Sequence, residues 1–118
     1  MRPITLELGM GADVHGHDYT KAAVRAVSDA IRHSSLTLFY LYKRPSEMKI
    51  EVTVGVQEPE KVNKTEVAKA LPFGKIEVKV VKGGLNDDGM GGAEDISLAV
   101  VGVKVWLDTS NHPFKLEN

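Results

Sequence analysis

The sequence predicts a single α+β domain in which one β-sheet carries two helices on one of its faces. Three observations lead to this prediction: four segments alternate apolar and polar residues, two segments have helical spacing, and the order along the chain is strand, helix, strand, helix, strand, strand. Because the last two strands follow each other directly, we expect them to pair as a long-looped hairpin. A chain of 118 residues is long enough to bury one core of this kind.

The first half of the chain predicts a strand followed by a helix. Apolar residues alternate with polar ones over residues 4–8, and we expect Gly9 and Gly11 to end this strand because glycine lets the backbone turn. Asp18 is a typical helix N-cap residue, and it precedes apolar positions with helical spacing. A helix over about 19–34 is therefore expected to lie against the sheet.

The second half predicts a strand, a short helix and two more strands. Residues 50–56 alternate clearly, residues 76–82 alternate as far as Val80, and residues 96–107 form the longest alternating run. Between the first two runs, Asn63 is followed three residues later by Glu66, which is the pattern of a capping box at the start of a helix.

Three further segments are less regular. Residues 36–42 are apolar at both odd and even positions, which fits either an edge strand or a buried connector. Residues 83–92 form a glycine-rich, acidic loop. Residues 108–118 are polar and contain a proline, so we expect a C-terminal arm at the end of a domain that spans 1–118.

Composition excludes several classes of protein. The 15 basic residues balance the 16 acidic ones, so nothing favours nucleic acid or an anionic membrane as a partner. The chain has no cysteine, which excludes disulfides and thiolate chemistry, and it has no apolar run of membrane-spanning length. The first residues lack an unbroken apolar segment of the signal-peptide type. We therefore expect a soluble cytoplasmic protein.

The sheet face opposite the helices is expected to carry apolar side chains. Val81, Leu98 and Val100 occupy positions that a half-exposed strand would give to polar residues. A sheet with one uncovered apolar face usually associates with another copy, so the sequence predicts a homo-oligomer.

The segment 9–17, Gly-Met-Gly-Ala-Asp-Val-His-Gly-His, is the strongest candidate for a functional site. It lies at a predicted corner between a strand and a helix, where backbone amides and side chains can converge on a ligand. A dinucleotide-binding fingerprint would require a third glycine at position 14, where Val14 stands, and an acidic residue near 32–35, which is missing. The corner therefore predicts a site of another kind.

Two chemistries fit the corner. Asp13 and His15 can act as an acid–base pair, because a carboxylate can hold one imidazole tautomer while the other nitrogen exchanges a proton. Alternatively, with His17 and Asp18, they have the spacing of ligands to a divalent metal. We expect Asp13 and His15 to point into one pocket whose floor is Gly9 and Gly11, although Asp13 can also cap the turn through backbone amides. The remaining candidate ligand-binding residues are Gly16, His17, Lys21, Gly83 and Gly84.

The motif Gly9-x-Gly11-x-Asp13-x-His15-Gly16 resembles the signature of a family of conserved hypothetical proteins from bacteria and plants. The resemblance continues through the helix and extends over about residues 3–105, and it implies no established activity or cofactor. The order of elements also resembles the chorismate-mutase-like architecture, with a ferredoxin-like arrangement as the alternative. That resemblance implies assembly into trimers, with dimers as the second choice, and small-molecule sites between subunits.

Two classes of function remain open from the sequence. The first is a small-molecule enzyme of the lyase, isomerase or hydrolase type that uses Asp13 and His15 for proton transfer. The second is a non-catalytic oligomer that binds a small anionic ligand or a divalent metal at the same corner.

Overall fold

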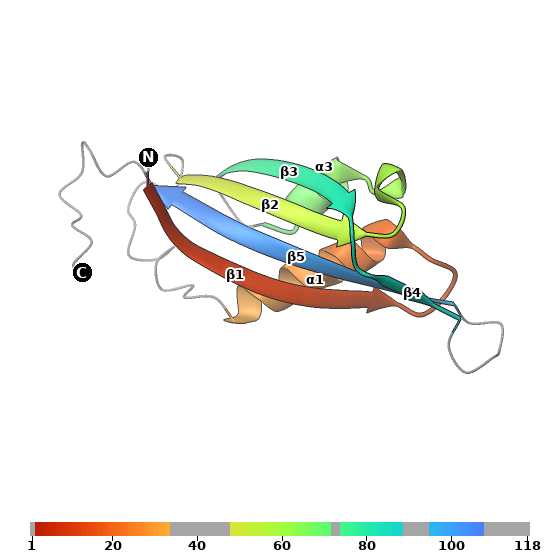
Figure 1. Ribbon diagram of the computed structural model, residues 1–118. Coiled ribbons are helices and arrows are strands. Elements are labelled where there is room, and N and C mark those ends of the chain that lie inside the picture. Colours follow the sequence, from red (N-terminus) through yellow and green to blue (C-terminus); the bar gives the residue numbers. More distant parts are fainter. Residues whose placement is uncertain (1, 34–47, 72–73, 89–94, 108–118) are drawn as a thin grey trace.

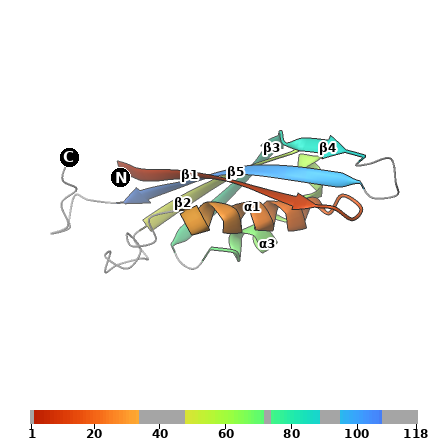
Figure 2. The ribbon, with the colours of Figure 1, turned by 90° about the horizontal axis from the view of Figure 1, so that it is seen from below.

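The computed structural model describes residues 2–33, 48–71, 74–88 and 95–107. These residues form one twisted sheet with both α-helices on the same side, so the protein has the predicted α+β class (Figures 1 and 2). The expected segments 36–42 and 108–118 lie outside the described residues. The elements are β1 (Arg2–Asp13), α1 (Tyr19–His33), β2 (Met48–Val56), η2 (Pro59–Lys61), α3 (Lys64–Ala68), β3 (Lys75–Lys82), β4 (Leu85–Asp87) and β5 (Ile96–Leu107).

The strands are arranged in the order β1-β5-β2-β3, and the short β4 pairs with the beginning of β5. β5 is antiparallel to both β1 and β2, whereas β2 and β3 are parallel. The prediction that the last two long strands pair as a hairpin is wrong. A strand, a helical crossover and another strand favour parallel pairing, so β3 joins β2, and β5 enters between β1 and β2.

β1 continues through its glycines as far as Asp13, so the prediction that Gly9 and Gly11 end this strand is wrong. Both glycines lie under α1, where a side chain would not fit. A Cβ atom on Gly9 would be 2.4 Å from the carbonyl oxygen of Ala26, and one on Gly11 would be 2.3 Å from the nitrogen of Ala26. The glycines therefore allow close packing of helix on strand. The alternate side chains of β1 are exposed on the other face of the sheet: Leu6, Leu8 and Met10.

α1 begins where the sequence predicts. The Asp18 side chain accepts a hydrogen bond from the backbone N–H of Lys21 (3.0 Å), which confirms Asp18 as the N-cap residue. The buried side of the helix is made mainly of alanines, which bring it close to the sheet: Ala22, Ala23, Ala26, Val27 and Ala30.

α3 is capped by Asn63, as predicted, but the cap is completed differently. The Asn63 side chain accepts hydrogen bonds from the N–H groups of Thr65 (3.0 Å) and Glu66 (3.2 Å). Glu66 pairs with Lys69 (3.1 Å), and the N–H of Asn63 is instead bonded by the Thr20 hydroxyl of α1 (2.9 Å). This hydrogen bond ties the two helices together on one face of the sheet.

The hydrophobic core lies between the helices and the sheet, and valines of β2 and β5 supply much of it. The opposite face, which we call the open face, is covered by neither helix (Figure 2). Val81 and Val100 are exposed there at 37% and 38%, in agreement with the predicted apolar character of that face.

Candidate functional site

A row of polar side chains crosses the sheet on its helix-covered face, at the end where α1 begins. Asp13 of β1 is the register partner of Ser97 on β5, and Ser97 is the partner of Asn86 on β4. Asp13 and Ser97 are 2% and 1% exposed. Burial of polar groups is costly unless they are hydrogen-bonded, so this row needs partners from the turn above it.

His17 supplies one of those partners. Its Nδ1 is hydrogen-bonded to the hydroxyl of Ser97, and its Nε2 lies 3.3 Å from a carboxylate oxygen of Asp95. The imidazole also stacks on the ring of Tyr19, with centroids 5.9 Å apart and planes inclined by 9°. Because 29% of its side chain is exposed, His17 is accessible from solvent although three residues hold it in place.

The backbone of His17 is in the left-handed region, with φ of +58°. This conformation is uncommon for residues other than glycine and costs of the order of 1–3 kcal/mol. Gly16, with φ of +84°, precedes it and forms the same tight turn. The contacts of the ring with Ser97, Asp95 and Tyr19 therefore hold a strained residue in one orientation.

The partners of the imidazole determine where its protons lie. A carboxylate can only accept a hydrogen bond, so Nε2, which faces Asp95, carries a proton. In the neutral ring, Nδ1 is then the acceptor and the Ser97 hydroxyl is the donor. The Nε2–H of His17 thus points to the carboxylate of Asp95, whose side chain is 46% exposed.

Tyr19 links His17 to a second group of polar residues. Its hydroxyl donates to a carboxylate oxygen of Glu58 (2.6 Å) and accepts from the side-chain amide of Asn86 (2.7 Å). The Tyr19 hydroxyl, together with Lys61 at 3.1 Å from Glu58, lowers the pKa of that carboxyl group. The buried carbonyl oxygen of Asn86 has no hydrogen-bond partner among the described residues. We refer to the six residues of this site as the corner cluster: His17, Tyr19, Glu58, Asn86, Asp95 and Ser97.

Asp13 adjoins the corner cluster but acts on the backbone of the turn. Its carboxylate accepts a hydrogen bond from the N–H of Asp18 (2.8 Å) and lies 4.0 Å from the guanidinium of Arg25. It therefore positions the turn, which is the alternative role that the sequence left open. His15 lies in the same turn with an exposed side chain.

The other candidate ligand-binding residues are spread over two regions. Gly9 and Gly11 support α1, as described above, and Lys21 is exposed on its first turn. Gly83 donates its N–H to the carbonyl of Val56 (2.9 Å), and the side chain of Gln57 donates to the carbonyl oxygens of Gly83 (3.1 Å) and Gly84 (3.3 Å). These glycines shape the β3–β4 connection.

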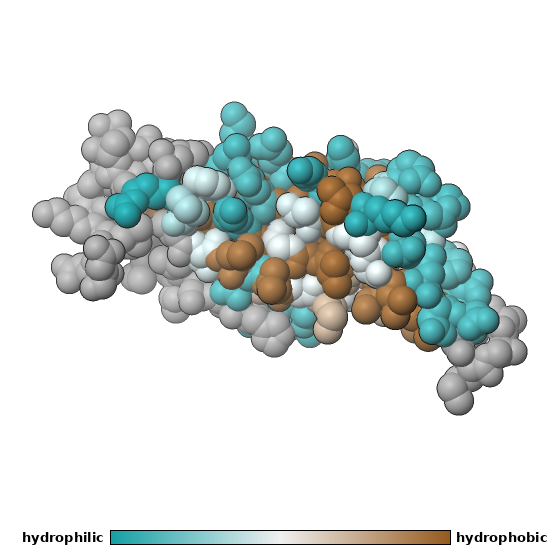
Figure 3. Space-filling model, in the orientation of Figure 1, coloured by the Kyte–Doolittle hydropathy of each residue, from teal (hydrophilic) through white to brown (hydrophobic). Residues whose placement is uncertain are grey.

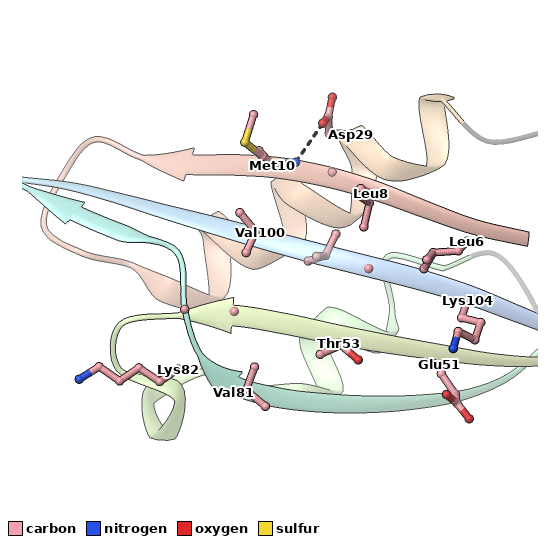
Figure 4. Close-up of a pocket in the computed structure, with 15 residues that line it drawn as sticks. Leu6, Leu8, Met10, Asp29, Glu51, Thr53, Val81, Lys82, Val100 and Lys104 are labelled. Carbon is pink, nitrogen blue, oxygen red and sulfur yellow. Dashed lines mark hydrogen bonds between the residues drawn. The ribbon is translucent and has the colours of Figure 1, made fainter.

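A groove lies on the open face of the sheet. This groove has a volume of about 820 Å³ and is shown in Figure 4. Gly9 contributes to its lining, whereas Gly11, Asp13 and His15 do not line this groove. β1 extends to Asp13, so Asp13 and His15 lie beyond the part of the sheet that lines the groove. Its apolar walls are Leu6, Leu8, Met10, Val81 and Val100.

Comparison with known proteins places the chain in a family. Residues 3–105 match the conserved hypothetical protein family Lin0512_fam. The chain belongs to this family. The range is the one over which the sequence resembles the family of conserved hypothetical proteins, so that expectation is confirmed.

A solved structure supports the same assignment. The chain is similar to an FtsZ-like protein of unknown function from Nostoc punctiforme PCC 73102, with 35% sequence identity and a TM-score of 0.80. The similarity covers 91% of this chain and 96% of that one. A comparison with curated proteins found no match. The family and the similar structure therefore establish relationship and fold, and they supply no activity.

Two further observations concern metals and membranes. Within residues 2–33, 48–71, 74–88 and 95–107, no group of three or more His, Cys, Asp or Glu side chains is arranged to hold a metal ion. In the same part of the chain, every helix is too short or too polar to cross a membrane.

Sequence reasoning located the corner but missed most of the corner cluster. Ser97 carries a signal that could have revealed the cluster. It is a polar residue on the buried face of β5, the face that also carries Ala99, Val101 and Val103. Glu58 and Tyr19 carry no comparable signal, since their contact joins residues 39 positions apart.

Proposed function

We propose that this cytoplasmic protein acts on a small molecule at the corner cluster, with His17 as the proton donor. The observation that supports this most strongly is the orientation of His17, whose strained backbone is held between Ser97 and Asp95. Strain of this kind is typical of functional positions. The proposal keeps the acid–base chemistry expected at the corner and moves the proton-transfer role from Asp13 and His15 to His17.

The polar groups around His17 favour a ligand that donates hydrogen bonds. The carboxylates of Asp95 and Glu58 are 46% and 41% exposed, and the carbonyl oxygen of Asn86 is an unused acceptor among the described residues. An amine or a hydroxyl group satisfies such acceptors, whereas an anionic group would meet two carboxylates. We therefore favour a small amine or polyol over the anionic ligand considered from sequence.

The Asp95 carboxylate would stabilise the doubly protonated ring, in which Nδ1 and Nε2 both carry protons. Nε2 of His17 would then give its proton to a basic or leaving atom of the ligand, and the ring would become neutral with Nδ1–H donating to the Ser97 hydroxyl. The Ser97 hydroxyl is buried and serves as a positioning group, so nucleophilic attack by this serine is not part of the proposal.

The experiment is a screen of small amines and polyols by ¹H–¹⁵N correlation spectra of the labelled protein. We expect binding to shift the amides of Tyr19, Asn86 and Ser97, and His17→Gln to weaken it at least tenfold. His15→Gln is the matched control, because it removes an imidazole from the same turn, and it should change the affinity by less than twofold. Shifts confined to the groove of the open face, or an equal loss in both variants, would contradict the proposal.

We also propose the chorismate-mutase-like architecture in preference to the ferredoxin-like alternative. The ferredoxin-like order β-α-β-β-α-β needs two consecutive strands between its helices. Within the described residues, β2 is the one strand between α1 and the helical segment that contains α3, and β2 pairs in parallel with β3. This order and the placement of both helices on one face support the first architecture.

A further inference from the structure

The open face of the sheet carries an uncovered apolar patch over β1 and β5, bordered by hydrophilic residues toward β3 (Figure 3). Leu6, Leu8 and Met10 of β1 are 56%, 70% and 60% exposed there. Figure 4 shows these side chains along one wall of the groove, with Val100 on β5 and Val81 on β3. Patches of several large apolar side chains on a folded domain usually mark an interaction surface.

We infer that the open face packs against the open face of another copy of this chain, around a two-fold or three-fold axis. This inference rests on the sheet surface and is independent of the function proposed for the corner cluster. Three features of the face support it: its size, its charges and the protection of the sheet edges.

The size of the face fits a stable protein interface. Its four main strands have 12, 9, 8 and 12 residues. At about 3.4 Å per residue and about 4.8 Å between strands, the face spans roughly 650 Å² before the relief of side chains is counted. A standard interface buries about 800 Å² on each partner, so the whole face is close to the area that one stable contact requires.

The charges of the groove favour a partner with the same distribution. Two acidic side chains, Asp29 and Glu51, and two basic ones, Lys82 and Lys104, line it together with the apolar residues. A groove with equal numbers of both signs does not attract a strongly acidic or basic partner, but two such grooves can meet with opposite charges paired. A second copy is therefore the occupant that the charges fit.

Both edges of the sheet are protected against pairing with another strand, so a second copy is expected to bind at the open face. At the outer edge of β1, the Asp29 carboxylate accepts the N–H of Met10 (3.0 Å), and Arg25 donates to the carbonyl of Ala12 (2.6 Å). These side chains of α1 occupy backbone groups that would otherwise pair with another strand. The strand at the opposite edge, β3, carries Lys75, Lys79 and Lys82, and edge lysines also oppose strand addition.

The experiment measures the mass of the native protein by light scattering after size exclusion at 10–100 μM. We expect the wild type to have two or three times the mass of the 12.9 kDa chain. Val100→Lys should reduce this to one chain, because it places identical charges in the contact. Val14→Lys is the matched control, since Val14 is equally exposed (40% against 38%) but lies outside the sheet, and it should leave the mass unchanged.

Leu8→Lys provides a second variant on the edge strand, where a lysine is compatible with folding. Circular dichroism and thermal melting verify that each variant is folded. A wild-type mass of one chain would overturn the inference. So would an oligomer that persists in folded Val100→Lys and Leu8→Lys, because another surface or a small apolar ligand would then account for the open face.

Discussion

Nδ1 of His17 and the hydroxyl of Ser97 are hydrogen-bonded although 80 positions separate them in the chain. The contact joins the turn before α1 to the beginning of β5, and it forms because β5 pairs with β1 so that Ser97 is the register partner of Asp13. The geometry of the corner cluster thus depends on the order of the strands, and a variant of either residue should affect the other.

This coupling between His17 and Ser97 can be measured in a double-mutant cycle. We expect Ser97→Ala and His17→Gln each to lower the free energy of unfolding, and the double variant to lose about 1 kcal/mol less than the sum of the two. Urea denaturation of the four proteins provides the values. Additive losses would show that the hydrogen bond makes no contribution of its own.

Asp13→Ala should destabilise the protein more than His15→Ala. The Asp13 carboxylate is buried and bonded to the N–H of Asp18, so its removal leaves a backbone donor without a partner at a cost of about 1–3 kcal/mol. His15 is exposed, and such substitutions usually remain within about 0.5 kcal/mol. Thermal melting of both variants checks this, and equal melting temperatures would contradict the assigned role of Asp13.

Gly11→Ala should be far more costly than Gly102→Ala. A Cβ atom at Gly11 would lie 2.3 Å from the backbone of α1, whereas at Gly102 the nearest atoms are side-chain methyl carbons of Leu6 (3.6 Å) and Leu8 (3.7 Å). We expect the first variant to lose about 3 kcal/mol or more, because the helix must move, and the second to be nearly neutral. Chemical denaturation tests the difference, and similar stabilities would mean that α1 does not approach β1 so closely.

The acid stability of the protein should depend on Tyr19. Hydrogen bonding from the Tyr19 hydroxyl, followed by Lys61, lowers the pKa of Glu58 below its ordinary value of 4.5. A carboxyl group with a lowered pKa stabilises the fold above its unfolded value, and that contribution is lost as the pH falls through the folded value. Tyr19→Phe should therefore flatten the decline of stability below pH 4.5, as measured by urea denaturation across that range. An unchanged slope would show that the hydroxyl does not affect this titration.

The sequence predicts the elements of this fold better than their pairing. Alternation and capping residues are local properties, so β2, β5 and the caps at Asp18 and Asn63 lie where we expected them. The face of β1 was harder to infer, because its glycines occupy the helix-covered side where large apolar residues are usual. The position of β5 between β1 and β2 depends on contacts between residues far apart in the sequence, so no local pattern predicts it.

For the candidate site too, the sequence predicts local features but not the contacts between distant segments. The glycines and histidines of 9–17 mark the corner in the sequence, and Asp13 and His17 both have defined partners there. Asp95, Asn86 and Glu58 come from three other segments, and only folding brings them to the imidazole and its stacked tyrosine. A search for motifs along the chain therefore finds the turn and leaves out the residues around it.

In the neutral ring of His17, Nε2 carries the proton while Ser97 holds Nδ1. A long-range ¹H–¹⁵N spectrum of the imidazoles in labelled protein measures this directly, with His17→Gln used to assign the signals. At a pH where the ring is neutral, we predict that Nε2 carries the proton and that Ser97→Ala shifts the Nδ1 resonance. A proton on Nδ1 with Nε2 unprotonated, or an Nδ1 signal unaffected by Ser97→Ala, would contradict the account.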